Sequence, residues 1–241
     1  MRRIEFHAQD PLEHIALDAL ALERAEAGEV DESVRLWMSE RVFVALGRGA
    51  RSALECDLAR CRADAVPVVR RTSGGGTVLQ GPGCLNFSLV LRYDRDRRFR
   101  DIHGSYGAVL GALARALRAF GLDVLFEPIC DLTLDGRKFS GNAQARKRHF
   151  FLHHGTILFD FELDRIARYL PHPPREPHYR HGRPHGSFIT NLPLARHELE
   201  RVLLGLYPPD QSVYIPSASD LARIQSAIRN QFASDDWNLG R

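Results

Sequence analysis

The sequence predicts an α/β fold (α+β) in which mixed or antiparallel sheets are flanked by helices. Short apolar or alternating runs, typical of strands, recur along the chain between segments whose apolar residues have helical spacing. With 241 residues, of which 44% are hydrophobic and 26% charged, the chain is long enough to bury a full core. Neither an internal repeat nor a linker divides it, so we expect residues 1–241 to form one domain.

The first half of the chain predicts helices and strands in alternation. Leu12, Ile15, Ala16, Ala19 and Leu20 recur at helical spacing and mark an amphipathic first helix. The elements that follow are strands over 34–38 and 42–46 joined by a polar turn, a helix near 52–63, a strand over 66–69, an apolar step at 78–79, and a strand over 86–92 that returns as its partner from the turn at 80–83.

The second half begins with a helix marked by Leu110, Leu113, Leu117 and Phe120, which we expect Gly121 to end. The later elements are a strand over 131–134, a return strand from 138, a strand over 150–161, a short helix over 165–170, and helices over 196–204 and 218–231. The proline-rich segment 171–186 is expected to be irregular.

Composition and charge exclude several functional classes. No apolar run is long enough to cross a bilayer, and the N-terminus lacks the apolar segment of a signal peptide, so we expect a cytoplasmic protein without a membrane partner. The four cysteines form no CxxC pair and should be free thiols. The net charge of +3 favours an acidic partner. Nucleic acid is the rival explanation, but no basic patch interleaved with aromatic residues supports it.

A glycine-rich run is the most informative stretch of the chain. Arg70-Arg71-Thr-Ser-Gly-Gly-Gly-Thr77 follows a short strand and precedes the apolar Val78-Leu79. Three consecutive glycines cost backbone entropy, so they are expected where the backbone must approach a ligand closely. Their N–H groups can turn toward an anion, and the arginines add full charges. The alternative is a glycine-rich hairpin with solvated arginines.

A second segment, 131–144, places a lysine beside further glycines. Asp135-Gly136 is a strong signal for a type I′ hairpin, so Lys138 should begin the return strand. The step Ser140-Gly141 follows directly and exposes backbone amides. A lysine in this position can reach a phosphate or carboxylate as a point charge. A surface lysine after a tight turn is the alternative.

The two segments, together with His-His-Gly-Thr at 153–156, resemble the lipoate–protein ligase family of the biotin and lipoate ligase superfamily. The resemblance covers nearly the whole chain and continues to Thr190-Asn191-Leu192 and Asp236-Trp237-Asn238. It implies the catalytic-domain fold of that superfamily. It also implies an enzyme that joins lipoate or octanoate to the α-phosphate of ATP and passes the acyl group to a lysine of a lipoyl carrier domain.

The resemblance assigns roles to individual residues. Lys138 matches the lysine of the family's Gly-x-Lys-x-Ser-Gly motif and is expected to contact the carboxyl carbonyl and the α-phosphate as the catalytic residue. Asp131 lies where the family has an aspartate near Mg²⁺ and the phosphates. The substrate- and ATP-binding residues implied in this way are Arg70, Ser73, Gly74, Gly75, Gly76, Thr77, Val78, Gly136, Ser140, Gly141, Ala143, His154, Gly155 and Thr156. Apolar strand residues beside them would form a dry tunnel for the acyl chain.

Some features depart from the family's pattern. The resemblance gives one of His153 and His154 a part in shaping the pocket, whereas a strand histidine with a satisfied ring is the alternative. Tyr179 to Gly186 replaces a loop that carries a lysine in the family, and arginines could cover phosphates there. Four histidines at 172, 178, 181 and 185 invite a metal-site hypothesis, but their spacing fits no standard zinc pattern. Many ligases continue into an accessory domain, which we expect to come from a separate polypeptide or to be dispensable here.

Two of the cysteines are consistent with a second enzymatic function. The same fold serves octanoyltransferases, which use a cysteine thioester and no ATP, and both Cys84 and Cys130 fall near the expected pocket. Neither lies where the resemblance would put the transferase nucleophile, so we favour the ligase. A non-catalytic carrier-binding domain would have lost Lys138 or the glycines, and all are present. The preferred acid, the acceptor protein, the need for an accessory subunit and the oligomeric state are not predicted.

Overall fold

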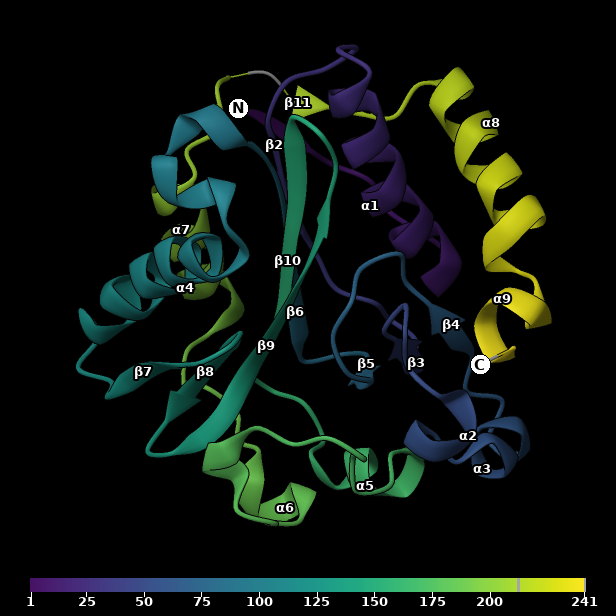
Figure 1. Cartoon of the computed structure of the whole chain (residues 1–241), viewed down its shortest axis with the longest axis vertical. Helices are drawn as coiled ribbons and strands as arrows, with labels where there is room; N and C mark the ends of the chain where they lie inside the picture. Colours follow the sequence, from purple (N-terminus) through teal and green to yellow (C-terminus); the bar gives the residue numbers. More distant parts are fainter. Residues whose placement is uncertain (212, 241) are drawn as a thin grey trace.

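A computed structural model describes residues 1–211 and 213–240 of the chain. Its centre is an eight-stranded sheet, beside whose lower part lies a three-stranded sheet (Figure 1). The large sheet is mixed, since β1 pairs in parallel with β11 and β2 whereas the other neighbours are antiparallel. In spatial order its strands are β11 (Val213–Tyr214), β1 (Arg2–Ile4), β2 (Ser33–Trp37), β6 (Cys84–Arg92), β10 (Phe150–Leu158), β9 (Arg137–Arg146), β8 (Asp131–Leu134) and β7 (Val124–Glu127).

The small sheet has β3 (Phe43–Leu46) between β4 (Val68–Arg70), which is parallel to it, and β5 (Val78–Gln80), which is antiparallel. The expected partnership of the strand at 78–79 with the strand at 86–92 is therefore wrong, because the chain changes sheets between β5 and β6. Gly83 permits this change, since its φ is +86° and a Cβ there would lie 2.2 Å from the Asp160 carbonyl oxygen. Periodicity identifies strands but not their partners.

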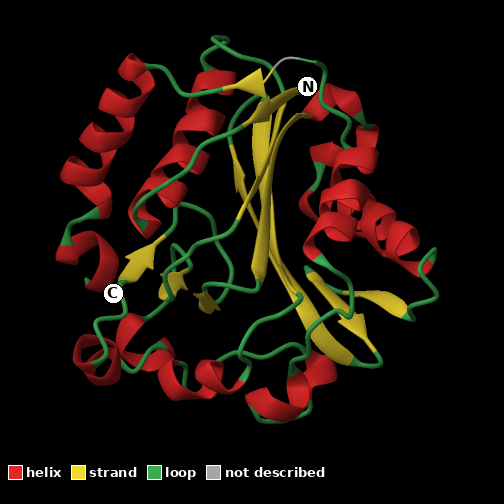
Figure 2. Ribbon diagram, turned by 180° about the vertical axis from the view of Figure 1, so that it is seen from behind, coloured by secondary structure: helices red, strands yellow, loops and turns green. Residues whose placement is uncertain are grey.

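Helices cover both faces of the large sheet (Figures 1 and 2). On one side lie α4 (Ile102–Arg118) and α7 (Arg196–Leu206), and on the other lies α1 (Pro11–Glu26), with α8 (Ala218–Ala227) packed outside it. The shorter helices are α2 (Ser52–Glu55), α3 (Leu58–Ala63), α5 (Asp164–Tyr169), α6 (His185–Phe188) and α9 (Asp235–Leu239), the 3₁₀ turns η1 (Tyr93–Arg95), η2 (Arg97–Arg100) and η3 (His178–Arg180), and the π-helical turn η4 (Ile228–Phe232).

Local sequence explains several of these boundaries. Asp10 caps α1 in a capping box with Glu13. The helix expected near 52–63 is two helices, because Cys56 is extended and the Asp57 side chain starts α3 by accepting from the Arg60 N–H. The segment 171–186 is less irregular than expected, since it contains η3 and the start of α6. Gly121, with a φ of +78°, follows the end of α4 after the C-cap Ala119.

The main core lies between the large sheet and the α4–α7 face, and β6 is buried along nearly its whole length because helices flank both of its sides. None of the described helices combines the length and apolar character that a membrane span requires.

Candidate active site

The predicted hairpin positions Lys138. Asp135 and Gly136 have φ values of +50° and +70°, as a type I′ turn requires, and β9 begins directly after them. Lys138 Nζ lies 2.8 Å from Asp131 Oδ1 on the neighbouring strand β8. The second carboxylate oxygen of Asp131 accepts a hydrogen bond of 2.7 Å from the Tyr179 hydroxyl. The lysine is thus held by a carboxylate whose own position is fixed from the other side.

The glycine run forms an open loop between β4 and β5. Gly75 has a φ of +88°, and a Cβ on Gly47 would lie 1.9 Å from the Gly75 carbonyl oxygen, so the two backbones meet closely. Gly74, Gly75 and Gly76 are exposed residues, and their N–H groups have no hydrogen-bond partner within the described ranges. This arrangement provides the free backbone donors that anion binding needs.

Arg70 is the last residue of β4 and Arg71 follows it directly, and their side chains have different surroundings. Arg70 is 1% exposed, and its guanidinium donates to the carbonyl oxygens of Gly47, Ala50, Trp237 and Asn238. The structure therefore places Arg70 against the C-terminal helix and outside both cavities described below, which corrects its expected place beside the ligand.

Arg71, which the sequence analysis did not assign to the site, lines the inner cavity instead. Its guanidinium donates to the Ser73 hydroxyl and to the carbonyl oxygens of Ala45, Gly74 and Gly76. Burial lowers the pKa of Arg71 to about 10, so the group is still a cation at neutral pH. Alternation continued one residue past the end of β4 could have identified it.

Two cavities meet at Lys138. An inner cavity of about 120 Å³ is lined by β5, β6, β9 and β10 residues and reaches Trp37. An outer cavity of about 590 Å³ is bounded by α5, α6 and the segment 171–188. The residues that line both are Gly76, Thr77, Val78, Cys130, Asp131, Lys138, Gly141 and Thr156.

Most of the expected site residues are brought together here. The inner cavity also contains Ala143, His154 and Gly155, and the outer one contains Ser140. Five expected residues line neither cavity: Arg70, Ser73, Gly74, Gly75 and Gly136. Ser73 is buried behind Arg71 and His154, and Gly136 forms the hairpin turn.

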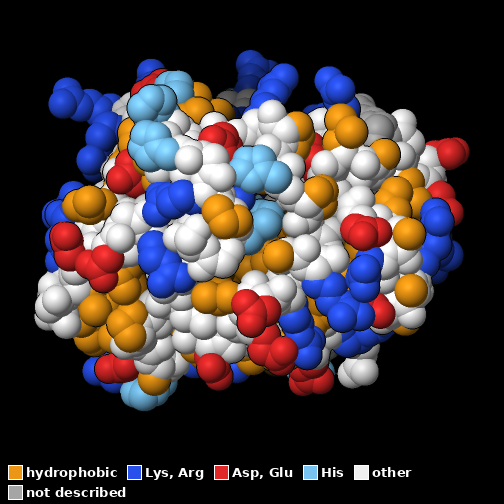
Figure 3. Space-filling model, turned by 90° about the horizontal axis from the view of Figure 1, so that it is seen from below, with side chains coloured by type: hydrophobic (Ala, Val, Ile, Leu, Met, Phe, Trp, Pro, Cys, Tyr) orange, Lys and Arg blue, Asp and Glu red, His pale blue; other side chains and the backbone are white. Residues whose placement is uncertain are grey.

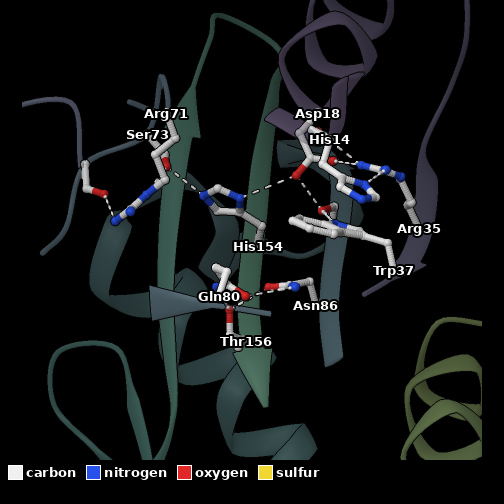
Figure 4. Close-up of polar contacts among 12 residues, drawn as sticks. His14, Asp18, Arg35, Trp37, Arg71, Ser73, Gln80, Asn86, His154 and Thr156 are labelled. Carbon is white, nitrogen blue, oxygen red and sulfur yellow. Dashed lines mark hydrogen bonds and ion pairs between the residues drawn. The ribbon is translucent and has the colours of Figure 1, made fainter. Parts of the chain in front are cut away.

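The wall of the inner cavity is less apolar than the predicted tunnel. Gln80, Asn86 and Thr156 form a closed set of hydrogen bonds, from Gln80 to Thr156 (2.6 Å), from Thr156 to Asn86 (2.6 Å) and from Asn86 to Gln80 (3.1 Å) (Figure 4). Gln80 and Asn86 were not predicted. The alternation of Asn86 and Ser88 with large apolar residues in β6 is the signal that could have found a polar lining.

The neighbouring histidines have different environments because they face opposite sides of β10. His153 is fully buried in the core, and burial lowers its pKa to about 3, so its ring is neutral. His154 lines the inner cavity and contacts Ser73 on one side and Asp18 on the other. The pocket histidine is therefore His154, and His153 is a core residue.

The two candidate cysteines also differ. Cys84 is fully buried in an apolar cluster, and burial raises its pKa to about 12. Its expected place near the pocket is not observed. Cys130 lines both cavities, but burial, with Asp131 adding to it and Lys138 opposing it, raises the pKa of its thiol to about 11. At neutral pH both groups are thiols.

Histidine and arginine side chains gather on the lower face of the molecule (Figure 3). In this region His172 contacts Glu176, His185 contacts the Pro171 carbonyl oxygen, and the rings of His178 and His181 pack edge to face. No group of three or more histidine, cysteine, aspartate or glutamate side chains could hold a metal ion within the part of the chain described. Both oxygens of Asp131 are engaged as well. These residues do not fit a magnesium site built by the protein.

Comparisons with known proteins agree on the family. The chain is 27% identical over 158 residues to lipoate–protein ligase LplJ of Bacillus subtilis, covering 66% of this chain and 45% of that protein. It is 22% identical over 273 residues to octanoyltransferase LipM of Brevibacillus brevis, covering 100% and 99%. The chain spans about half the length of the first curated ligases it matches.

Solved structures share the fold. A bipartite lipoate–protein ligase of Thermoplasma acidophilum, studied with its E2 lipoyl domain, has a TM-score of 0.78 at 20% identity and covers 99% of this chain and 96% of its own. A lipoate–protein ligase A bound with ATP has a TM-score of 0.78 at 20% identity, covering 99% and 98%. Because residues 10–199 match the lipoyl protein ligase A/B catalytic domain model, the chain belongs to the lipoyl protein ligase A/B family.

Proposed function

We propose that this protein is an ATP-dependent lipoate–protein ligase that makes an acyl-adenylate from lipoate or octanoate and transfers the acyl group to a lipoyl carrier domain. The observation that carries the proposal is the position of Lys138 where a narrow cavity meets a wider one. The narrow cavity suits the carboxyl end of a chain-like acid, and the wider one has room for a nucleotide beside the same ammonium group.

The proposed reaction has two steps, and negative charge develops on different oxygen atoms in each. In the first step a carboxylate oxygen attacks the α-phosphorus of ATP and pyrophosphate leaves; in the second, the amine of the carrier lysine attacks the acyl carbon and AMP leaves. Negative charge develops on phosphate oxygens first and on the carbonyl oxygen later. Lys138 and the free N–H group of Gly76, the glycine of the run that lines both cavities, supply preorganised donors for both, and each such donor contributes about 3 kcal/mol.

Relatives support the partners of this reaction. A solved ligase with the same fold holds ATP, and another was studied with its E2 lipoyl domain. The net charge of +3 favours an acidic carrier. We propose the lipoyl domain as acceptor, with a separate accessory subunit as a further partner, in a cytoplasmic setting and with residues 1–241 acting as one catalytic domain. Magnesium would then be held by the triphosphate rather than by Asp131.

A second candidate is an octanoyltransferase that uses a cysteine thioester and no ATP. Cys130 favours it, because this thiol lines both cavities beside Lys138, and octanoyltransferase LipM matches the whole chain. The raised pKa of Cys130 weakens it, since a nucleophilic cysteine needs an accessible thiolate.

One mass-spectrometric experiment separates the two. The purified protein is incubated with an apo lipoyl domain and lipoate, with and without ATP, and the mass of the carrier is measured. We expect modification only with ATP, a loss of about 100-fold or more in Lys138→Ala, and an unchanged rate in Lys147→Ala, which removes an exposed lysine beyond the other end of β9. Full activity of Lys138→Ala would refute its assignment.

The cysteines supply the second arm of this experiment. Cys130→Ser and Cys84→Ser should leave ATP-dependent transfer within about threefold of the original rate, since neither thiol takes part in adenylation. Transfer from an octanoyl carrier without ATP, abolished in Cys130→Ser together with a hydroxylamine-sensitive acyl-enzyme, would establish the transferase instead.

A further inference from the structure

Four polar side chains from distant parts of the sequence form a line that ends at the glycine run (Figure 4). Arg35 Nη1 lies 2.9 Å from Asp18 Oδ1, and Asp18 Oδ2 lies 3.5 Å from His154 Nδ1. On the other side of the ring, His154 Nε2 lies 2.6 Å from Ser73 Oγ. The line thus connects β2 and α1, through β10, to the loop before β5.

Serine, histidine and aspartate are connected in the same order in the catalytic triads of hydrolases. Ser73 cannot act as such a nucleophile, because a substrate has no access to its hydroxyl. Ser73 is 1% exposed and lines neither cavity. Its oxygen also accepts a hydrogen bond of 3.0 Å from Arg71 Nε. No substrate carbonyl can reach this hydroxyl. The four side chains therefore form a structural hydrogen-bond network and not a nucleophile with its base.

The direction of each hydrogen bond follows from the end at Arg35. An arginine can only donate, and an ionised carboxylate can only accept. Burial raises the pKa of Asp18, but hydrogen bonds from His154 and Ser88 and the charge of Arg35 outweigh it, so the carboxyl is ionised. Asp18 Oδ2 therefore accepts a hydrogen bond from His154 Nδ1–H. In the neutral ring Nε2 then carries no proton, so it accepts from the Ser73 hydroxyl, whose oxygen accepts from Arg71 Nε.

Arg71 connects these hydrogen-bonded residues to the glycine run. Its Nη2 donates to the carbonyl oxygens of Gly74 and Gly76 at 2.7 and 2.8 Å. We propose that Asp18 and Arg35 are positioning residues, which act through His154 and Ser73 to orient Arg71 and hold the glycine run in its reactive conformation. The effect on catalysis rests on the proposed function. The donor and acceptor in each of these hydrogen bonds do not depend on it.

The neighbourhood of Arg35 explains why the line is anchored at this end. Arg35 Nη2 lies 2.6 Å from His14 Nδ1, and the His14 ring stacks on Trp37 with 4.1 Å between the ring centroids. Burial and the charge of Arg35 lower the pKa of His14 to about 3, so its ring is a neutral acceptor. Arg35 is thus fixed by a neutral ring and by Asp18, and it cannot turn away from the carboxylate.

Asp18→Asn tests the proposal because it should move the ring proton of His154 from Nδ1 to Nε2. Arg35 can only donate, so the amide oxygen of the new residue must face Arg35 and its NH₂ must face His154. The NH₂ then donates to Nδ1, the proton moves to Nε2, and the Ser73 oxygen receives two donors. Long-range ¹H–¹⁵N spectra report the tautomer. His153 is the internal reference, since its Nδ1 lies 3.2 Å from Gln144 Nε2 and should not change.

We expect His154 to change from the Nδ1–H to the Nε2–H form in Asp18→Asn and to keep the Nδ1–H form in Ser88→Ala. The second variant removes another donor to Asp18 and the acceptor of the Trp37 indole N–H, but it leaves the Asp18 carboxylate in place. A His154 ring that stays in the Nδ1–H form in Asp18→Asn overturns the proposal. This result does not depend on activity, so a protein without ligase activity can still support or refute the hydrogen-bond order.

Kinetics with the carrier assay supply the second test. Asp18→Asn and Ser73→Ala should each lower kcat/KM by about 10- to 100-fold, a fraction of the effect of removing a direct donor. Because both act through Ser73, the double variant should be no slower than the slower single variant. Multiplying effects would show independent roles and overturn the proposal. If Asp18→Asn does not fold, Ser73→Ala alone must lower kcat/KM with His154 still in its Nδ1–H form, and a normal rate refutes it.

Discussion

The contact between Gly47 and Gly75 offers the sharpest test of how rigidly the glycine run is held. A Cβ on Gly47 would lie 1.9 Å from the Gly75 carbonyl oxygen, whereas real Cβ contacts are not shorter than 3.0 Å. In Gly47→Ala the two backbones must therefore separate by about 1.1 Å. Neither atom can rotate away, because both belong to backbone and Arg70 also binds the Gly47 carbonyl oxygen.

Two magnitudes follow from this displacement. Forced repacking of this kind costs about 2 kcal/mol, which lowers the Tm of a chain of this size by about 4 to 8 °C. A shift of about 1 Å in a group that positions the reaction costs about 100-fold in rate. We therefore expect Gly47→Ala to be folded at 25 °C and nearly inactive in the carrier assay.

Gly49→Ala is the matched control. It lies two residues away on the same loop, and a Cβ there meets nothing within 4 Å. Its Tm should change by less than about 2 °C, and its kcat/KM should stay within about twofold of the original value. Circular dichroism melting and the carrier assay measure both variants. If Gly47→Ala matches Gly49→Ala in both measurements, the glycine run moves freely and the close contact has no functional weight.

Two further predictions concern stability. Burial holds the pKa of His14 and His153 at about 3 in the folded chain, whereas an unfolded imidazole titrates near 6.5, so the unfolded state binds more protons between these values. Stability should be complete above pH 6.5 and fall toward pH 4 by up to about 2.7 kcal/mol per pH unit; an unchanged urea midpoint from pH 7 to 5 would contradict this. Arg70→Ala should cost about 3 kcal/mol or more, since the carbonyl oxygens of Trp237 and Asn238 lose their donor; an unaltered melting curve would argue against it.

Some features of the fold are determined by neighbouring residues, and others by contacts between distant parts of the chain. The turn before Lys138 was predicted correctly because Asp135-Gly136 specifies a type I′ turn without help from the rest of the chain. The change of sheet after β5 was missed, because a strand carries no local record of its partner. The turn needs only neighbouring residues, and its prediction succeeded.

The candidate site also depends in part on contacts between segments that are distant in the sequence. Residues matched by motif, such as Thr77, Gly141 and Gly155, do line the inner cavity. Asp18 and Arg35 could not have been connected with His154, because only the packing of α1 against β6 and β10 brings these segments together. Ser73 was assigned to the ligand for its place in the motif, and the structure gives its hydroxyl to two neighbouring side chains instead.

Among the described residues, two side chains with a full positive charge line the inner cavity, Lys138 and Arg71, and they differ in the groups that balance this charge, which indicates where an acid would bind first. The charge of Lys138 is offset by Asp131 at 2.8 Å. Arg71 donates only to uncharged carbonyl and hydroxyl oxygens, and no acidic side chain of the described residues forms an ion pair with it. Burying a cation without a counter-charge is costly, and an anion that enters the inner cavity removes that cost. A carboxylate should therefore bind beside Arg71 before ATP arrives, and by linkage lipoate alone should raise the Tm.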